Sequence, residues 1–439
     1  MLPEPSVPPS LAGLLAHLRP CFRTAATFTT FCALVCGMLA QTGRRTVCGM
    51  LVGSGLSQLW SHHRAHRFFS RATWSAEKLG LLLAGIVVRL LLPAGAEVNV
   101  VIDDTLLKRS GRRVWAASWF HDGSAKGPKA TGFGNNWVLV GIVVSLPMLT
   151  RPVCLPVLSR LVRKGTVSSS RLWLARQMVT ALAQALPGRR IHVVADAAYA
   201  GKELRGMPEQ VTWTTRLRKD AALYDVAPPR TGRPGAPRKK GKRLPKLAAL
   251  ARTATFTPAT VLRYGKTDTV HVATVRCLWY SVFGSQHVTV VLLREDAADT
   301  GYDLALITTD LQATAAQVIE RYATRWCIEV AIEDAKQLVG VGQARNRVAA
   351  AVERTVPFGL VCQTLAVCWY ATAGHHPDDV TEHRTRAPWY RTKTQPSIAD
   401  MLGKLRRVLI AARFRCARLD QPTSTEIQAI RLAWENPAA

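Results

Sequence analysis

The sequence has 439 residues, of which 48% are hydrophobic and 20% are charged. This length exceeds one ordinary hydrophobic core, and the apolar content excludes a largely disordered chain. Lysine and arginine number 58 against 29 acidic residues, and the net charge of +29 indicates a polyanionic partner, most simply nucleic acid. Acidic side chains are scarce, so those that follow apolar strands are the first candidates for chemistry.

Neither a membrane span nor a secretory signal is expected. The longest apolar stretches, residues 79–88 and 137–149, are shorter than the ~20 residues that a spanning helix needs. The N-terminus lacks a charged segment followed by an apolar core. The ten cysteines form no CxxC pair and mostly have apolar neighbours, which predicts free, buried thiols in a reducing cytoplasm.

The first 216 residues predict a helical region followed by strands. Residues 1–95 hold nine basic and two acidic residues, with apolar side chains at three- and four-residue steps, which favours a helical, basic, DNA-binding domain. Residues 96–216 form the first part of the main fold. They contain β-rich segments at 98–102, 137–145 and 153–158, a helix at 170–186, and strands at 191–195 and 211–215. This order predicts a mixed sheet covered by helices.

The second half of the chain begins with an insertion. Residues 217–302 combine strands near 261–280 and 287–293 with an exposed loop that carries eight basic residues between Arg230 and Lys246. A solvated linker and a phosphate-backbone contact explain this loop equally well. Its candidate DNA contacts are Arg233, Arg238, Lys239 and Lys240.

The main fold then resumes. Residues 303–378 contain a strand at 304–309, a long helix at 314–338 and an apolar helix at 350–374. Residues 379–439 form a basic tail that is helical in its second half.

Acidic residues follow two of the predicted strands. Asp103 and Asp104 come after the strand at 98–102, and Asp196 comes after the strand at 191–195. Carboxylates at strand ends lie at the rim of a sheet, where open α/β folds place their sites. Either one alone is better explained as a turn or helix-cap residue.

The long helix adds a third acidic element. Tyr322, Arg325, Glu329 and Lys336 fall within about 60° of one another on a helix of 3.6 residues per turn. An Arg325–Glu329 pair is the simplest explanation of this stripe. However, Glu333 lies four residues after Glu329, and two carboxylates on one stripe favour a bound cation. Helical geometry does not choose between Glu329 and Glu333.

The spacing Tyr322-x2-Arg325-x3-Glu329-x6-Lys336 resembles the signature of the DDE transposases of bacterial insertion sequences. That resemblance implies a ribonuclease-H-like catalytic domain with a β-rich insertion between the second and third acids. It also implies that Tyr322, Arg325 and Lys336 contact phosphates near the scissile bond. The implied catalytic and metal-binding acids are Asp104, Asp196 and Glu329, with Asp103 and Glu333 as alternatives.

The implied activity is cut-and-paste DNA transposition. Three carboxylates suit two Mg²⁺ ions, with Mn²⁺ as a substitute, for cleavage at transposon ends and strand transfer into target DNA. The implied partners are double-stranded terminal inverted repeats and target DNA, bound by a homodimer when two ends are synapsed. We expect a cytoplasmic, nucleoid-associated bacterial protein with no membrane partner. The alternatives are a transposase-derived DNA-binding protein and a stand-alone nuclease without strand transfer.

Overall fold

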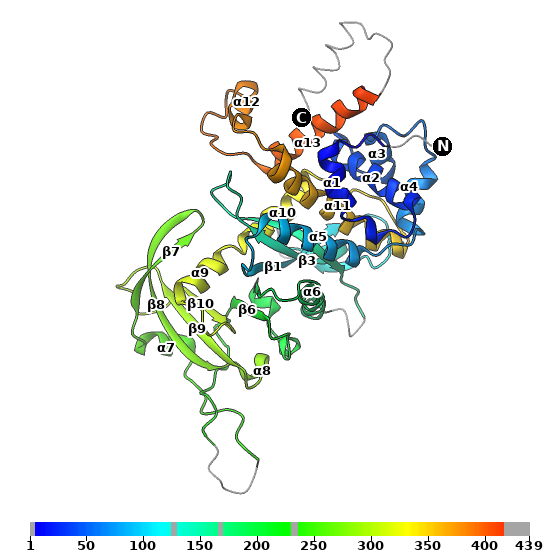
Figure 1. Ribbon diagram of the computed structural model, residues 1–439. Coiled ribbons are helices and arrows are strands. Elements are labelled where there is room, and N and C mark those ends of the chain that lie inside the picture. Colours follow the sequence, from blue (N-terminus) through cyan, green and yellow to red (C-terminus); the bar gives the residue numbers. More distant parts are fainter. Residues whose placement is uncertain (1–4, 124–129, 166–169, 230–235, 417–439) are drawn as a thin grey trace.

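A large mixed sheet with helices on both faces dominates the computed structural model, which describes residues 5–123, 130–165, 170–229 and 236–416 (Figure 1). Within these residues ten strands follow the order β2-β3-β1-β5-β6-β10-β9-β8-β7, and β4 also pairs with β3. The strands are β1 (Val98–Lys108), β2 (Ser118–His121), β3 (Thr131–Val144), β4 (Val153–Leu161), β5 (Ile191–Ala195), β6 (Val211–Arg216), β7 (Thr257–Arg263), β8 (Lys266–Leu278), β9 (His287–Arg294) and β10 (Leu304–Thr308).

Five of these strands form the ribonuclease-H-like part of the sheet. β4, β3 and β1 are antiparallel neighbours, and β5 and β6 then run parallel to β1. All five residues of β5 are buried, which explains its apolar, β-branched sequence between two parallel neighbours. This arrangement confirms the predicted fold class.

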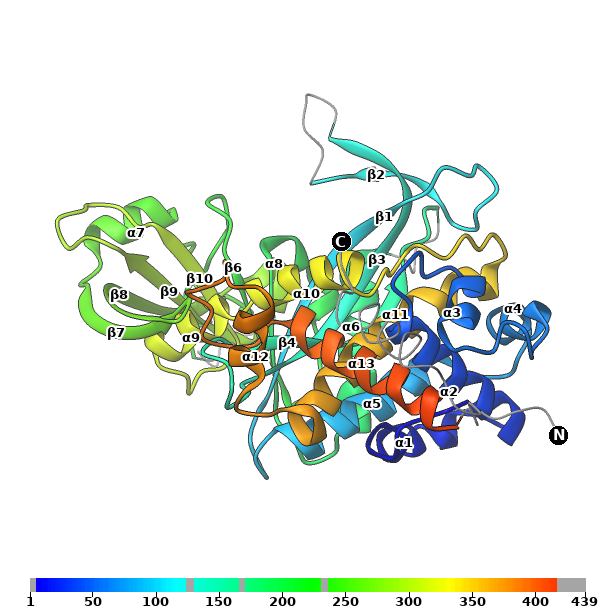
Figure 2. The same ribbon diagram turned by 90° about the horizontal axis from the view of Figure 1, so that it is seen from above.

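The predicted β-rich insertion extends the same sheet. β10 pairs antiparallel with β6 on one side and with β9 on the other, and β8 and β7 follow. The short helices α7 (Leu247–Thr253) and α8 (Tyr280–Phe283) belong to this extension. Seen from above, it lies at the opposite end of the molecule from the N-terminal helices (Figure 2).

The described residues that precede β1 are mainly helical. Thr24, Thr46, Ser61 and Ser75 each accept a hydrogen bond from the first turn of the helix that they precede. These helices share one hydrophobic core with the sheet. They are α1 (Pro9–Ala16), α2 (Ala25–Ala40), α3 (Val47–Gly53), α4 (His62–Ser70) and α5 (Ala76–Leu91).

The central helix of this core is α11 (Ala349–Trp369), which contacts β4, α2, α4 and α5. Together with the π-helical turn that follows, η5 (Tyr370–Gly374), it is the one helix among the described residues with the length and mean hydropathy of a membrane span. However, 83% of that apolar window is buried inside the protein. It is therefore explained as a core helix.

Further helices pack on the sheet and on the helical core. α6 (Arg171–Ala185) packs on β3, and Ser170 caps its N-terminus, one residue from the predicted start of this helix. The predicted long helix at 314–338 is instead two helices, α9 (Ala315–Ala323) and α10 (Trp326–Gln337). The C-terminal segment contributes α12 (Asp379–Arg386) and α13 (Ile398–Cys416), and α13 packs on α2 and α11. The nine cysteines whose side chains are described are free thiols, and seven of them are buried.

One close backbone contact sets the distance between α5 and β4. A Cβ added at Gly80 would lie 2.1 Å from the Val157 carbonyl oxygen, whereas a Cβ at Gly85 of the same helix would meet nothing within 4 Å. Only glycine therefore fits at position 80.

We expect Gly80→Ala to lower the free energy of unfolding by about 1–3 kcal/mol, because the added methyl group overpacks this contact. The matched control, Gly85→Ala, should raise it by about 0.5–1 kcal/mol through helix propensity alone. Urea denaturation of both variants measures the difference. Equal effects would contradict the close packing of α5 on β4.

A histidine lies at the centre of the sheet. His192 of β5 is fully buried, and its Nδ1 atom lies 2.7 Å from the Thr212 hydroxyl of β6. Burial, helped by the charge of Arg321 and opposed by that of Asp310, lowers the pKa of His192 to about 3. The folded protein therefore keeps this ring neutral, whereas the unfolded chain protonates it below about pH 6.5.

Stability should consequently fall as the pH drops below the unfolded pKa of His192, since only the unfolded chain takes up this proton. Between pH 7 and pH 5 the loss from this residue is about 2 kcal/mol. We expect His192→Gln to unfold with a correspondingly shallower pH dependence in denaturant titrations at both pH values. Identical slopes for the variant and the parent protein would show that His192 is charged in the fold.

Candidate active site

The first pair of candidate acids lies within a strand and not at its end. β1 continues to Lys108 because β3 pairs with it as far as Gly134. Asp103 and Asp104 are successive residues of this strand, so their side chains point to opposite faces of the sheet. Only one of the two can therefore face the helix that carries Glu329.

Register places Asp103 beside Asp196. Ile102 pairs with Ala195 across the parallel strands β1 and β5, and β5 ends there. The side chains of the next residues, Asp103 and Asp196, therefore lie on the same face of the sheet, on neighbouring strands. Asp196 is exposed and precedes the short helical turn η3 (Ala197–Tyr199).

Asp104 is held on the other face of the sheet. Its carboxylate accepts hydrogen bonds from the Asn136 side chain at 2.9 Å and from the Tyr199 hydroxyl at 3.1 Å. Arg171, the first residue of α6, forms an ion pair with it at 3.1 Å. These partners tie Asp104 to β3 and α6, away from α10.

Asp103 and Glu329 share one guanidinium. Arg325 lies 2.6 Å from the Glu329 carboxylate and 3.4 Å from that of Asp103. Burial raises the pKa of Asp103 to about 6, while the Asp104 amide and Arg325 stabilise its charged form. Arg325 therefore provides the positive charge that holds the Asp103 carboxylate of β1 and the Glu329 carboxylate of α10 close together.

The junction between α9 and α10 aims this arginine at the acids. The Arg325 amide donates to the Tyr322 carbonyl at 3.0 Å, and the Thr324 hydroxyl donates to the Arg321 carbonyl at 2.7 Å. These three-residue hydrogen bonds interrupt the regular helix, which is why the predicted single helix is wrong. Tyr322 is half-buried. Burial raises the pKa of Tyr322, Arg325 opposes this rise, and the negative charge of Asp196 adds to it.

The remaining signature residues lie further along α10. Glu333 is exposed and accepts a hydrogen bond from Gln337 at 2.8 Å, whereas Glu329 is the acid that shares Arg325 with Asp103. Lys336 is half-buried beside Thr105 and Leu107, which share the Asp103 face of β1. Burial lowers the pKa of Lys336.

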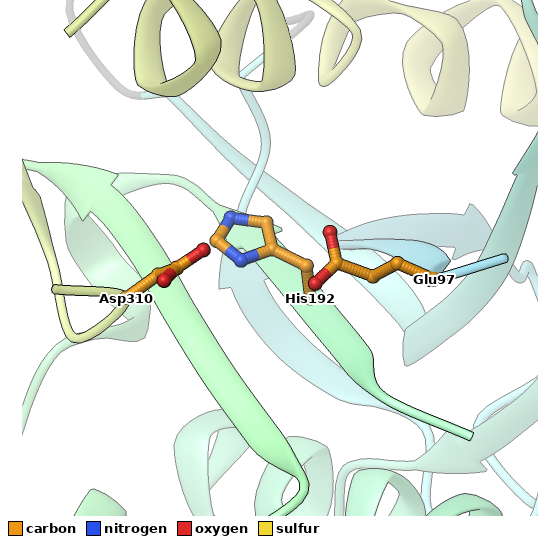
Figure 3. A group of neighbouring side chains, drawn as sticks. All are labelled: Glu97, His192 and Asp310. Carbon is orange, nitrogen blue, oxygen red and sulfur yellow. The ribbon is translucent and has the colours of Figure 1, made fainter. Parts of the chain in front are cut away.

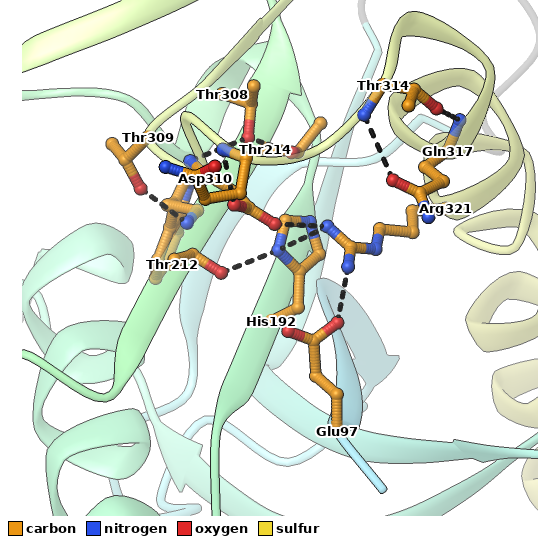
Figure 4. A network of polar contacts seen from close by, with 12 residues as sticks. Glu97, His192, Thr212, Thr214, Thr308, Thr309, Asp310, Thr314, Gln317 and Arg321 are labelled. Carbon is orange, nitrogen blue, oxygen red and sulfur yellow. Dashed lines mark hydrogen bonds and ion pairs between the residues drawn. The ribbon is translucent and has the colours of Figure 1, made fainter.

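Sequence reasoning missed a second polar cluster on this face. Ligand atoms of Glu97, His192 and Asp310 lie within 4.8 Å of one another (Figure 3), a proximity that the oxygens of Asp103, Asp196 and Glu329 do not reach together. Arg321 lies among them, 2.6 Å from Glu97 and 2.7 Å from Asp310 (Figure 4). Glu97 precedes β1 and Asp310 follows β10, so acids flanking strands were the available signal.

The basic loop of the insertion is only partly described. Arg238 and Lys239 are exposed, as a DNA contact requires, whereas Arg233 lies outside the described residues. The Lys240 ammonium lies 4.0 Å from the centre of the Tyr224 ring and 5.0 Å from that of Tyr280. Cation–π contacts of this kind anchor Lys240 to the insertion.

Comparison with known proteins identifies the family of this chain. A family model described as "DDE superfamily endonuclease" matches residues 17–276, a span that includes Asp103, Asp104 and Asp196 and ends before Glu329. A piggyBac transposase, solved as a synaptic complex with hairpin DNA, is similar at a TM-score of 0.42 and 12% identity, covering 98% of this chain and 82% of that one. No curated protein matches. Because the family match spans more than half of the sequence, the chain belongs to the DDE superfamily endonucleases, as its motifs predicted.

Proposed function

We propose that this endonuclease is a DNA transposase whose catalytic acids are Asp103, Asp196 and Glu329. The observation that carries the assignment is that these three residues share one face of the sheet. Asp103 and Asp196 follow a register pair of adjacent parallel strands, and Arg325 joins Asp103 to Glu329. Asp104, which the sequence favoured as the first acid, faces α6 and is already held by Arg171.

The donor set suits divalent metal ions. Three carboxylates offer only oxygen ligands, which Mg²⁺ prefers and Mn²⁺ accepts. We propose that Asp103, Asp196 and Glu329 hold two such ions. When bound, the metal supplies activation of water or a DNA 3′-hydroxyl and stabilisation of the leaving oxygen at phosphorus.

The other residues of the site are proposed to hold DNA. Arg325 neutralises Asp103 and Glu329 in this structure, and its guanidinium is also well shaped to bind a phosphate. Tyr322 lies beside it, and Lys336 presents a cation further along the same face. We assign all three to the phosphates that flank the scissile bond.

The net charge of +29 supports a long DNA partner. We propose that the substrates are terminal inverted repeats and target DNA, that a homodimer synapses two ends, and that the protein acts in the bacterial cytoplasm. Cleavage without joining would identify a stand-alone nuclease, and binding without cleavage would identify a DNA-binding derivative.

Asparagine at Asp103 or Asp196, or glutamine at Glu329, should reduce Mg²⁺-dependent end cleavage by roughly a thousandfold or more, because each change removes a metal ligand. The matched control is Asp104→Asn, which should keep cleavage within about tenfold of the parent protein. The assay incubates each protein with the DNA that flanks its gene and measures cleavage, joining to a second DNA, and binding. An inactive Asp104→Asn protein beside an active Asp103→Asn protein would reverse the assignment.

The insertion loop should contribute to affinity and not to chemistry. Replacing Arg238 and Lys239 with glutamine should lower the slope of log affinity against log salt by about two, since two phosphate contacts are lost. Lys240→Gln serves as the control and should change the slope by less, because its ammonium is engaged by two tyrosines. Fluorescence anisotropy at several salt concentrations measures the slopes. An unchanged slope for the double variant would exclude this loop from the DNA interface.

A further inference from the structure

Two arginines lie on either side of the α9–α10 junction, four residues apart, and each joins two carboxylates. Arg325 joins Asp103 to Glu329 within the proposed active site. Arg321 joins Glu97, just before β1, to Asp310, just after β10. Figure 4 shows this second arrangement, with the Arg321 side chain extending from α9 to lie between Glu97 and Asp310, beside His192.

The Arg321 cluster is well shielded from solvent. The side chains of Glu97, Asp310 and Arg321 are 14%, 16% and 20% exposed, so their ion pairs are screened much less than surface pairs. His192 lies beneath them, with its Nδ1 atom 3.5 Å from the guanidinium. Asp310 also accepts a hydrogen bond from the Gln312 amide at 3.1 Å. The guanidinium occupies the position between the acids that a cation would take.

The cluster and the proposed active site lie on the same face of the sheet. His192 lies in β5 and pairs with Asn99 of β1, and Asp196 follows β5 directly, four residues after His192. Glu97, just before β1, and Asp103, within it, are an even number of residues apart, so these side chains share one face. Glu97 and Asp103 are six residues apart, about 20 Å along an extended strand. Arg321 contacts Glu97 and Arg325 contacts Asp103, so the two arginines reach two separate positions along this length.

We propose that Arg321 is a positioning residue for the metal-binding acids. By joining Glu97 to Asp310, it fixes the C-terminal end of α9 over β1, β5 and β10. The Thr324 hydroxyl donates a hydrogen bond to the Arg321 carbonyl, which links the backbone at Arg321 to the junction between α9 and α10. Arg325 and Glu329 are thereby held beside Asp103 and Asp196. This inference rests on the proposed function.

The test compares variants of the full-length protein by two readouts. The first is the Mn²⁺ concentration that gives half of the metal-induced rise in the unfolding temperature, without DNA. The second is the Mg²⁺ concentration for half-maximal end cleavage. The variants are Arg321→Met, Arg321→Lys and Glu97→Gln. The matched control is Arg263→Met, which removes ion pairs to Asp268 and Glu295 in the insertion.

We expect Arg321→Met to raise both half-saturating concentrations at least tenfold, with cleavage recovering at high metal concentration. Arg321→Lys, which keeps the charge but cannot bridge two carboxylates as well, should lie between Arg321→Met and the parent protein, as should Glu97→Gln. Arg263→Met should match the parent protein within twofold. The lysine and glutamine variants keep the test informative if the methionine variant does not fold.

Three results would overturn the inference. Metal half-saturation unchanged in all three variants, whatever their stability, would make Arg321 a merely structural residue. A Mn²⁺ response lost in Glu97→Gln but kept in Asp103→Asn would make the cluster itself a metal site. An equal loss in Arg263→Met would show a general effect of ion-pair removal. Failure of the proposed function is distinct, because Asp103→Asn and Glu329→Gln would then keep both metal dependence and cleavage.

Discussion

The structure depends on holding carboxylates together on one face of a largely apolar sheet. Asp103 of β1 and Asp196, which follows β5, lie side by side on adjacent parallel strands. Glu329 of α10 is joined to Asp103 by Arg325. Like charges repel, and burial adds a desolvation cost, which the raised pKa of Asp103 reflects. Arg325 offsets both effects because its guanidinium lies between two of the acids. A chain with twice as many basic as acidic residues can supply such counter-charges readily.

The interrupted helix makes this geometry possible. If residues 315–337 formed one straight helix, it would have to cover the extension of the sheet and the ribonuclease-H-like strands in a single direction. Instead, α9 packs against β7 and β10, and α10 packs against β1 and β4. The junction at Thr324 and Arg325 joins these two directions. Arg321, just before this junction, pairs with Glu97 at the start of β1, and Arg325 pairs with Asp103 in the middle of the strand, so two positions of β1 are tied to the same short segment.

Much of this arrangement could be predicted from the sequence. Runs rich in β-branched apolar residues located the strands at 98–102 and 191–195, and the spacing of Tyr322, Arg325 and Glu329 indicated the chemistry. The choice between Asp103 and Asp104 could not be predicted, because it depends on which face of β1 the helix covers. The sequence also favoured a strand ending before these residues, whereas pairing with β3 extends it to Lys108. The Arg321 cluster was missed because its members come from β5 and from segments beside β1 and β10, which only the folded sheet brings together.

The central claim is that Asp103, Asp196 and Glu329 bind the catalytic metal together. The most direct measurement is anomalous diffraction from crystals of the protein grown with end DNA and Mn²⁺. We expect manganese peaks within coordination distance of all three carboxylates and none at Asp104. Manganese bound at Asp104, or only among Glu97, His192 and Asp310, would contradict it.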